Sequence, residues 1–277
     1  MQHTVSHRVG DFDVRILTDG RKSFPHAAFP GASQQTIDSL LARAGETEIR
    51  TNFNAVLVRG GGRTVLVDAG LRDLGGADAG NLAAGLAEAG CSADAVECLY
   101  LTHMHPDHMA GALTAEGKPA FAGAELAMSR AEHDFWADDA RFAGAEGDLA
   151  RWHALARQVL GAYAGRLRLI DGSDEIVPGM AQLPLPGHTP GHCGFRLGSG
   201  ADRFVYVTDI VHAEALQFPD PDIAVGFDID ADTARETRKR MLGELADGGL
   251  VFSGAHLLQP ALMRLERADG GFRPVRL

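Results

Sequence analysis

The segment THMHPDHMAG, residues 102–111, places four side chains that bind metals well within six positions. His103, His105, Asp107 and His108 offer imidazole nitrogens and a carboxylate, which are ligands that zinc and other divalent transition metals take from proteins. A single histidine is usually a structural residue with satisfied hydrogen bonds. Three histidines and an aspartate, directly after an apolar strand pattern, indicate a metal site instead.

One loop cannot complete a metal site, so further ligands are expected elsewhere in the chain. Three residues fit because each follows an apolar strand pattern: His188 in LPLPGHTPGH, Asp209 in RFVYVTD and His256 in LVFSGAH. The three cysteines are scattered without CxxC spacing, which argues against a thiolate site and against a disulfide framework. Any metal is therefore expected to be held by histidine and carboxylate.

Strand and helix patterns alternate along the whole chain, and they form the frame that must position these ligands. A hairpin is expected around Gly10–Asp11, and a buried strand at 96–102 runs directly into the histidine cluster. Further strands are expected within 54–70 and at 167–170, 180–185, 193–197, 203–209, 223–229, 250–255, 261–267 and 272–276. Helices are expected at 33–44, 81–89, 129–137, 149–160 and 232–246, with Ser33 as an N-cap and Ser129-x-x-Glu132 as a capping box. No linker or repeat divides the chain, so we predict one layered α/β domain spanning residues 1–277.

The local sequence also predicts how the cluster is arranged. If residues 99–105 form one extended strand, alternation aims His103 and His105 at the same side, close enough to share one ion. Pro106 then ends the strand, so Asp107 and His108 begin a short helical segment that is offset from the first pair. This offset favours a second ion beside the first.

Composition limits the class of partner. The chain has 277 residues, of which 45% are hydrophobic, and a formal net charge of -11, with 26 lysines and arginines against 37 acidic residues. Such an anionic protein has no broad attraction for nucleic acid or acidic membranes. The N-terminus lacks a signal-peptide pattern, and no apolar run approaches the roughly 18 residues that span a bilayer. We therefore expect a cytoplasmic protein that acts on a small molecule.

The ligand pattern resembles that of the metallo-β-lactamase superfamily. The matched residues are HxHxDH at 103–108, followed by His188, Asp209 and His256 at successive spacings of 80, 21 and 47 residues. Asp68, which closes TVLVDAG, matches an earlier acidic position of that family. The resemblance covers residues from about 50 to 258, and it implies a four-layer αββα sandwich with the metal site at one rim of the two sheets.

The resemblance also implies which residue does what. One ion would be held by His103, His105 and His188, the other by Asp107, His108 and His256, with Asp209 bridging the two. The ions would be zinc, or manganese, cobalt or iron according to availability. A hydroxide shared by both ions would attack the substrate, with Asp107 as proton acceptor and Asp209 as the second catalytic carboxylate.

Three positions near the proposed ligands are interpreted separately. Asp68 is expected to fix the tautomer of a histidine ligand, although a turn-forming aspartate before Gly70 is the alternative. His192 is interpreted as a turn-stabilising residue rather than a ligand. His212 stands three residues after Asp209, where acyl-homoserine lactonases of this superfamily typically carry a tyrosine, so it is expected beside the metal ligands.

Other segments resemble the branch that contains methyl parathion hydrolase and related aryl esterases and lactonases. LTDGRKSFPHAAFPG and AEHDFW are similar to segments of that branch, whose substrate pocket is lined by aromatic residues. The resemblance implies that Phe24, Phe29, Phe135 and Trp136 contact an apolar substrate, with ordinary core packing as the alternative for each. Relatives in this branch also suggest a homodimer.

The substrate class rests on departures from that branch. LLQPAL follows His256 where phosphotriesterases more usually show Pro-Phe-Pro, so a carboxylic ester or lactone is favoured over a phosphotriester. A dedicated acyl-homoserine lactonase is less favoured because of His212. A mononuclear iron persulfide dioxygenase would not need His108 and His256, and a catalytically inactive scaffold would be expected to lack ligands. The sequence therefore predicts a dinuclear metal-dependent hydrolase that acts on ester bonds.

Overall fold

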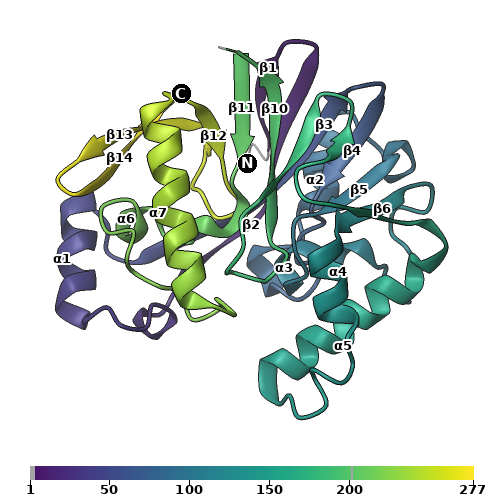
Figure 1. The fold of residues 1–277 in the computed structure, drawn as a ribbon, viewed down its shortest axis with the longest axis horizontal. Helices are drawn as coiled ribbons and strands as arrows, with labels where there is room; N and C mark the ends of the chain where they lie inside the picture. The colour runs from purple at the N-terminus through teal and green to yellow at the C-terminus, as the bar shows by residue number, and fades with distance from the viewer. Residues whose placement is uncertain (1–3, 201) are drawn as a thin grey trace.

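The computed structural model describes residues 4–200 and 202–277, which form two seven-stranded sheets packed face to face (Figure 1). The first sheet has the order β1 (Thr4–Val9), β2 (Phe12–Phe24), β3 (Ile49–Gly60), β4 (Arg63–Val67), β5 (Cys98–Leu101), β6 (Glu125–Ser129) and β7 (Leu167–Ile170). The second has the order β14 (Gly271–Arg276), β13 (Met263–Ala268), β12 (Val251–Ser253), β11 (Asp202–Tyr206), β10 (Cys193–Ser199), β9 (Met180–Pro184) and β8 (Glu175–Val177). Strands β4 to β7 run parallel, as do β11 and β12, so each sheet is mixed.

Helices cover the outer side of each sheet. On the first sheet lie α2 (Leu82–Glu88), α3 (Pro106–Met109), α4 (Arg130–Ala137) and α5 (Gly147–Ala162), and on the other side of the molecule lie α1 (Gln34–Ala44), α6 (Glu214–Gln217) and α7 (Ala231–Asp247) (Figure 1). Short 3₁₀ turns connect the elements at His26–Ala28, Gly76–Asp78, Ala93–Ala95, Ala110–Ala112, Ala164–Arg166 and Thr208–Ile210. The predicted αββα sandwich is confirmed. None of the helices in the described part of the chain has the length and apolar character needed to cross a membrane.

Strand β5 shows why the sequence before the histidine cluster is apolar without alternation. Cys98 and Tyr100 point into the core between the sheets, whereas Leu99 and Leu101 point into the core beneath the helices of the first sheet. All four are fully buried. A parallel strand covered on both faces requires apolar side chains at every position, and this burial fixes the strand end from which the cluster emerges.

Most predicted elements are present, but the strand predicted at 223–229 is wrong. This segment is an irregular loop with a turn at 226–227, and carbonyls at its start are bound by side chains instead of by another strand. Arg238 of α7 donates to the carbonyl oxygens of Pro221 and Ile223, and Gln217 also donates to that of Ile223. Because these buried groups are satisfied by side chains, the apolar run can fold as a loop.

Candidate metal centre

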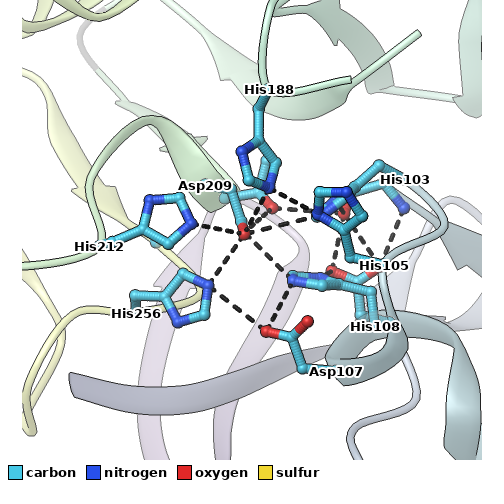
Figure 2. Close-up of polar contacts among 12 residues, drawn as sticks. His103, His105, Asp107, His108, His188, Asp209, His212 and His256 are labelled. Carbon is cyan, nitrogen blue, oxygen red and sulfur yellow. Dashed lines mark hydrogen bonds and ion pairs between the residues drawn. The ribbon is translucent and has the colours of Figure 1, made fainter. Parts of the chain in front are cut away.

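Five strand ends meet at one rim of the sandwich and bring the predicted ligands together. Asp68 follows β4, the 103–108 cluster follows β5, His188 follows β9, Asp209 follows β11 and His256 follows β12. In Figure 2 their side chains converge from several loops on the carboxylate of Asp209. The side chains of the five histidines and Asp209 are at most 3% exposed, so the cluster lies in a largely water-free environment.

The first group consists of His103, His105 and His188, whose ligand atoms lie within 4.8 Å of one another. Nδ1 of His105 is 2.9 Å from Nε2 of His188. Strand β5 ends at Leu101, before both histidines of the cluster's first half, so the continuous strand predicted as far as residue 105 is too long. The rings of His103 and His105 nevertheless lie 4.8 Å apart between centroids.

The second group consists of Asp107, His108, Asp209 and His256, again with ligand atoms within 4.8 Å. Asp107 and His108 lie on α3, where Pro106 occupies the first helical turn, a position that tolerates its missing N–H. Oδ2 of Asp107 is 3.3 Å from Nε2 of His108 and 3.5 Å from Nε2 of His256. Within the 103–108 cluster, the residues before Pro106 thus belong to the first group and the residues after it to the second.

Asp209 lies between the groups and contacts both. Its Oδ2 is 2.9 Å from Nε2 of His256 and 3.3 Å from Nε2 of His188, and its Oδ1 is 3.3 Å from Nε2 of His108 (Figure 2). Burial would raise the pKa of Asp209, but the surrounding histidines, His108 foremost, hold it well below its ordinary value. This carboxylate is therefore anionic and placed to bridge two cations.

Hydrogen bonds at the ring nitrogens that point away from the cluster fix the orientation of two histidines. Nδ1 of His188 bonds to Asp228, and Nδ1 of His256 bonds to the carbonyl oxygen of Asn52, which directs each Nε2 at the cluster. Within the described residues, Nε2 of His103 and Nε2 of His108 are buried without any hydrogen-bond partner. Buried polar atoms are normally satisfied, so unpaired imidazole nitrogens aimed at carboxylates fit a divalent ion.

Asp68 supports the second group through His108. Its Oδ2 is 2.8 Å from Nδ1 of His108, and its carboxylate also accepts from the backbone N–H and the hydroxyl of Thr102. Asp68 has a φ of 63° and Thr208 a φ of 44°, both in the left-handed region that non-glycine residues rarely adopt. Such strain is retained where the surrounding structure requires it, and here it lies at two loops that carry the centre.

A second carboxylate, Asp228, supports the first group and was missed by the sequence analysis. Oδ1 of Asp228 is 2.8 Å from Nδ1 of His188, and Oδ2 is 3.6 Å from the guanidinium of the buried Arg238. Burial would raise the pKa of Asp228, but its bond to His188 lowers it. The local pattern around 223–229 gave no signal for this role because it indicated a strand.

Replacing Asp228 with asparagine is expected to lower the affinity of the protein for one ion about 10- to 100-fold, because carboxylates bonded to a histidine ligand contribute about that much to metal affinity. The measurement is a chelator competition on the loaded protein. Exchanging the exposed Asp232 for asparagine serves as the control. Equal affinity in the Asp228→Asn variant and the wild type would contradict a supporting role.

Two further histidines lie next to the ligands. Nδ1 of His192 donates to the carbonyl oxygen of Leu185, and burial lowers the pKa of His192 to about 3. Its ligand atom also lies within 4.8 Å of those of His103 and Asp209. His212 stacks on His256 with ring centroids 4.5 Å apart, and its Nε2 is 3.3 Å from Oδ2 of Asp209. His212 therefore reaches the same carboxylate as the predicted ligands.

The cluster opens into a cavity of about 550 Å³. The polar part of its wall near the cluster is formed by His105, Asp107, His188, Asp209, His212 and His256. The apolar lining comprises Phe24, Phe53, Leu71, Leu74, Trp152, Leu155 and Phe227. Pockets of this size and character bind small molecules, with a few polar groups that fix orientation.

The structure brings one of the four predicted aromatic contacts to this cavity and leaves three outside its lining. Phe24 lines the cavity. Phe29 is buried in the core formed with α1, and Trp136 is fully buried and stacked on Phe142. Phe135 packs on the same side as Trp136, against the core of the first sheet. These three rings are held by core packing. The cavity is lined instead by Phe53, Trp152 and Phe227, which the sequence did not single out.

Comparisons with known proteins agree with this arrangement. The hydrolase AbOPH of the beta lactamase superfamily has 27% sequence identity and a TM-score of 0.92, with 100% of this chain and 98% of that chain covered. AidC, a dizinc quorum-quenching lactonase solved with its product N-hexanoyl-L-homoserine, has 27% identity and a TM-score of 0.91, with 100% and 99% covered. A probable metal-dependent hydrolase from Staphylococcus aureus, at 19% identity and a TM-score of 0.79 with 98% and 99% covered, shows the shared fold alone. No match was found among curated proteins.

A family model identifies the chain directly. The model described as the metallo-beta-lactamase superfamily matches residues 51–256, which begins in β3 and ends at His256, the last predicted ligand. The matched range contains both groups of side chains and Asp68. With this match, the sandwich and the converging ligands, the chain belongs to the metallo-beta-lactamase superfamily.

Proposed function

We propose that this protein is a metal-dependent hydrolase that holds two divalent ions and cleaves a carboxylic ester or a lactone of apolar character. The observation that carries the proposal is the pair of side-chain groups around Asp209, which open into a cavity with aromatic and aliphatic side chains in its lining. His103, His105 and His188 would hold one ion and Asp107, His108 and His256 the other. A mononuclear iron dioxygenase would leave the second group without a purpose.

Bound divalent ions would polarise the scissile carbonyl, lower the pKa of water and stabilise negative charge on the leaving oxygen. The nitrogen and oxygen ligands suit zinc. Among the described residues that line the cavity there is no serine or cysteine, so water is the expected nucleophile.

Asp107 is the proposed proton carrier. It lines the cavity, and its side chain is 19% exposed, more than any other member of the two groups. Its carboxylate would accept the proton that water loses on attacking the carbonyl carbon. As the C–O bond breaks, the same proton would pass to the departing alkoxide, giving an acid and an alcohol.

The apolar lining supports the substrate class. Phe24, Phe53, Trp152 and Phe227 present aromatic surface beside the ligands, which suits an acyl chain or an aryl group. AidC, whose solved complex contains an acyl-homoserine product, provides a precedent for a lactone. A phosphotriester is the alternative, and a homodimer and a cytoplasmic location remain predictions from the sequence.

The test combines metal content with activity on one sample. Elemental analysis of the purified protein is paired with assays against an aryl ester, an acyl-homoserine lactone and a phosphotriester. Near two divalent ions per chain, with metal-dependent hydrolysis fastest on the ester or lactone, is expected. A single iron with no hydrolysis would refute the proposal, and preference for the phosphotriester would overturn the substrate class.

Phe227 tests the cavity as the substrate site. Phe227→Ala is expected to lower kcat/KM for an apolar ester about tenfold, since the loss of a half-buried aromatic contact is worth about 1.5 kcal/mol. Metal content should stay the same. Phe135→Ala is the matched control, because both rings are half-buried but only Phe227 lines the cavity. A selectivity change in the Phe135 variant alone would place the substrate elsewhere.

A further inference from the structure

Glu132 on α4 is a fully buried carboxylate that lies between two ligand-bearing loops. The sequence pattern Ser129-x-x-Glu132 predicts a capping box, in which the glutamate returns to the backbone N–H of the serine. Only the serine half of that box forms: Oγ of Ser129 accepts from the backbone N–H of Glu132. The carboxylate of Glu132 is directed elsewhere.

Four donors surround this carboxylate. Oε1 accepts from the backbone N–H of Met104 at 2.8 Å and from Nε1 of Trp136 at 2.7 Å. Oε2 accepts from the hydroxyl of Thr189 at 2.5 Å and from the backbone N–H of Gly191 at 3.1 Å. Across the described residues, Glu132 forms no ion pair, so the hydrogen bonds are what compensate its burial.

Three of the four donors belong to the loops that carry the first group, and the fourth, Trp136, lies on α4 itself. Met104 is the residue between His103 and His105, and Thr189 directly follows His188. Gly191 permits the close approach of these segments, since a Cβ there would lie 2.0 Å from the backbone nitrogen of Glu132. One side chain therefore joins the two loops that supply all three histidines of the first group.

The second group has a different support. Asp68 bonds directly to His108, whereas it reaches the first group only through the hydroxyl of Thr102, which lies 3.2 Å from Nδ1 of His103. A buried carboxylate is costly where an apolar side chain would fill the same space, so packing alone does not explain Glu132. Its bonds explain it, because they fix the separation of the two loops.

We propose that Glu132 is a positioning residue for one of the two ions, the one held by His103, His105 and His188. Within the described structure it bonds to none of the proposed ligands and does not line the cavity, and it acts by holding the two loops at a fixed separation. The inference rests on the proposed two-ion site. It adds Glu132 to Asp228 as a support of the first site, whereas Asp68 bonds directly to a histidine of the second.

Release of zinc from the fully loaded protein to a coloured chelator tests this inference. Glu132→Gln keeps the shape but turns an NH₂ group toward two donors, so one ion should leave at least about tenfold faster while the other is unchanged. Asp68→Asn should accelerate release of the other ion instead. Thr189→Val removes one donor on a ligand loop and should accelerate release of the same ion as Glu132→Gln, by a smaller factor. Trp136→Phe removes a donor outside both loops and should leave both release rates unchanged.

A purely structural role predicts a different result. Glu132→Gln would then lower the Tm of the metal-free protein and leave both release rates at the wild-type values, which would overturn the inference, as would equal acceleration of both ions. If Glu132→Gln does not fold, Thr189→Val decides the matter, because wild-type release from that variant also overturns it. Fewer than two zinc ions in the wild type would instead refute the proposed function.

Discussion

Replacement of Asp209 by alanine is expected to lower kcat/KM for hydrolysis by about 10³-fold and to leave fewer than two ions per chain. Asp209 contacts both groups, with Oδ2 at 3.3 Å from Nε2 of His188 and 2.9 Å from Nε2 of His256. Alanine removes the shared anionic ligand and leaves the buried imidazoles without a carboxylate between them. Elemental analysis and steady-state kinetics on the same preparation measure both effects.

The control for this experiment is Asp171→Ala. Asp171 is an exposed aspartate that pairs with Arg130 on the surface, and its removal should leave metal content and turnover unchanged. Circular dichroism of the Asp209 variant establishes that it is folded. An Asp209→Ala protein that keeps two ions and wild-type turnover would contradict the ligand assignment.

Removal of metal by a strong chelator is expected to abolish hydrolysis and to lower the Tm by more than about 10 °C. At a free ion concentration about 1,000 times Kd, each ion stabilises the folded state by about 4 kcal/mol, and about 1 kcal/mol corresponds to about 2–4 °C for a chain somewhat shorter than this one. Without ions, buried imidazole nitrogens such as Nε2 of His103 and Nε2 of His108 have no partner that offsets the cost of their burial. Calorimetry with and without chelator measures the shift.

Restoration distinguishes metal loss from damage. Adding zinc back to the chelated protein should recover both Tm and turnover, and adding magnesium, which prefers oxygen ligands in octahedral geometry, should not. An unchanged Tm after complete removal of metal would mean that the buried ligands are stable by themselves. That result would contradict a centre whose buried carboxylates and imidazoles depend on bound ions.

The ligand cluster could be predicted because its signal is local. Four ligand-grade side chains stand within six positions, and Pro106 divides them into two segments through its own fixed backbone angle. His188, Asp209 and His256 could be found because each follows the end of an apolar strand. Patterns of this kind depend only on residues that are close in sequence, so they can be read from a single sequence.

The supporting residues could not be predicted in the same way, because their partners are distant in sequence. Asp228 bonds to His188 over 40 residues, and Glu132 bonds to Thr189 over 57 residues. The apolar pattern at 223–229 indicated a strand, but the segment is a loop whose Ile223 carbonyl accepts from the side chains of Gln217 and Arg238.

Local sequence was enough to predict which histidines and carboxylates gather at the candidate centre, their order and the strands that precede them. The tertiary structure alone decided which aromatic rings reach the cavity, placing Phe227 and Trp152 there and Trp136 in the core. It also decided that Glu132 leaves its capping box to join two loops. The physical reason is that ligand type and strand ends follow from local composition and backbone preference, whereas burial and hydrogen-bond partners are fixed only when distant segments pack together.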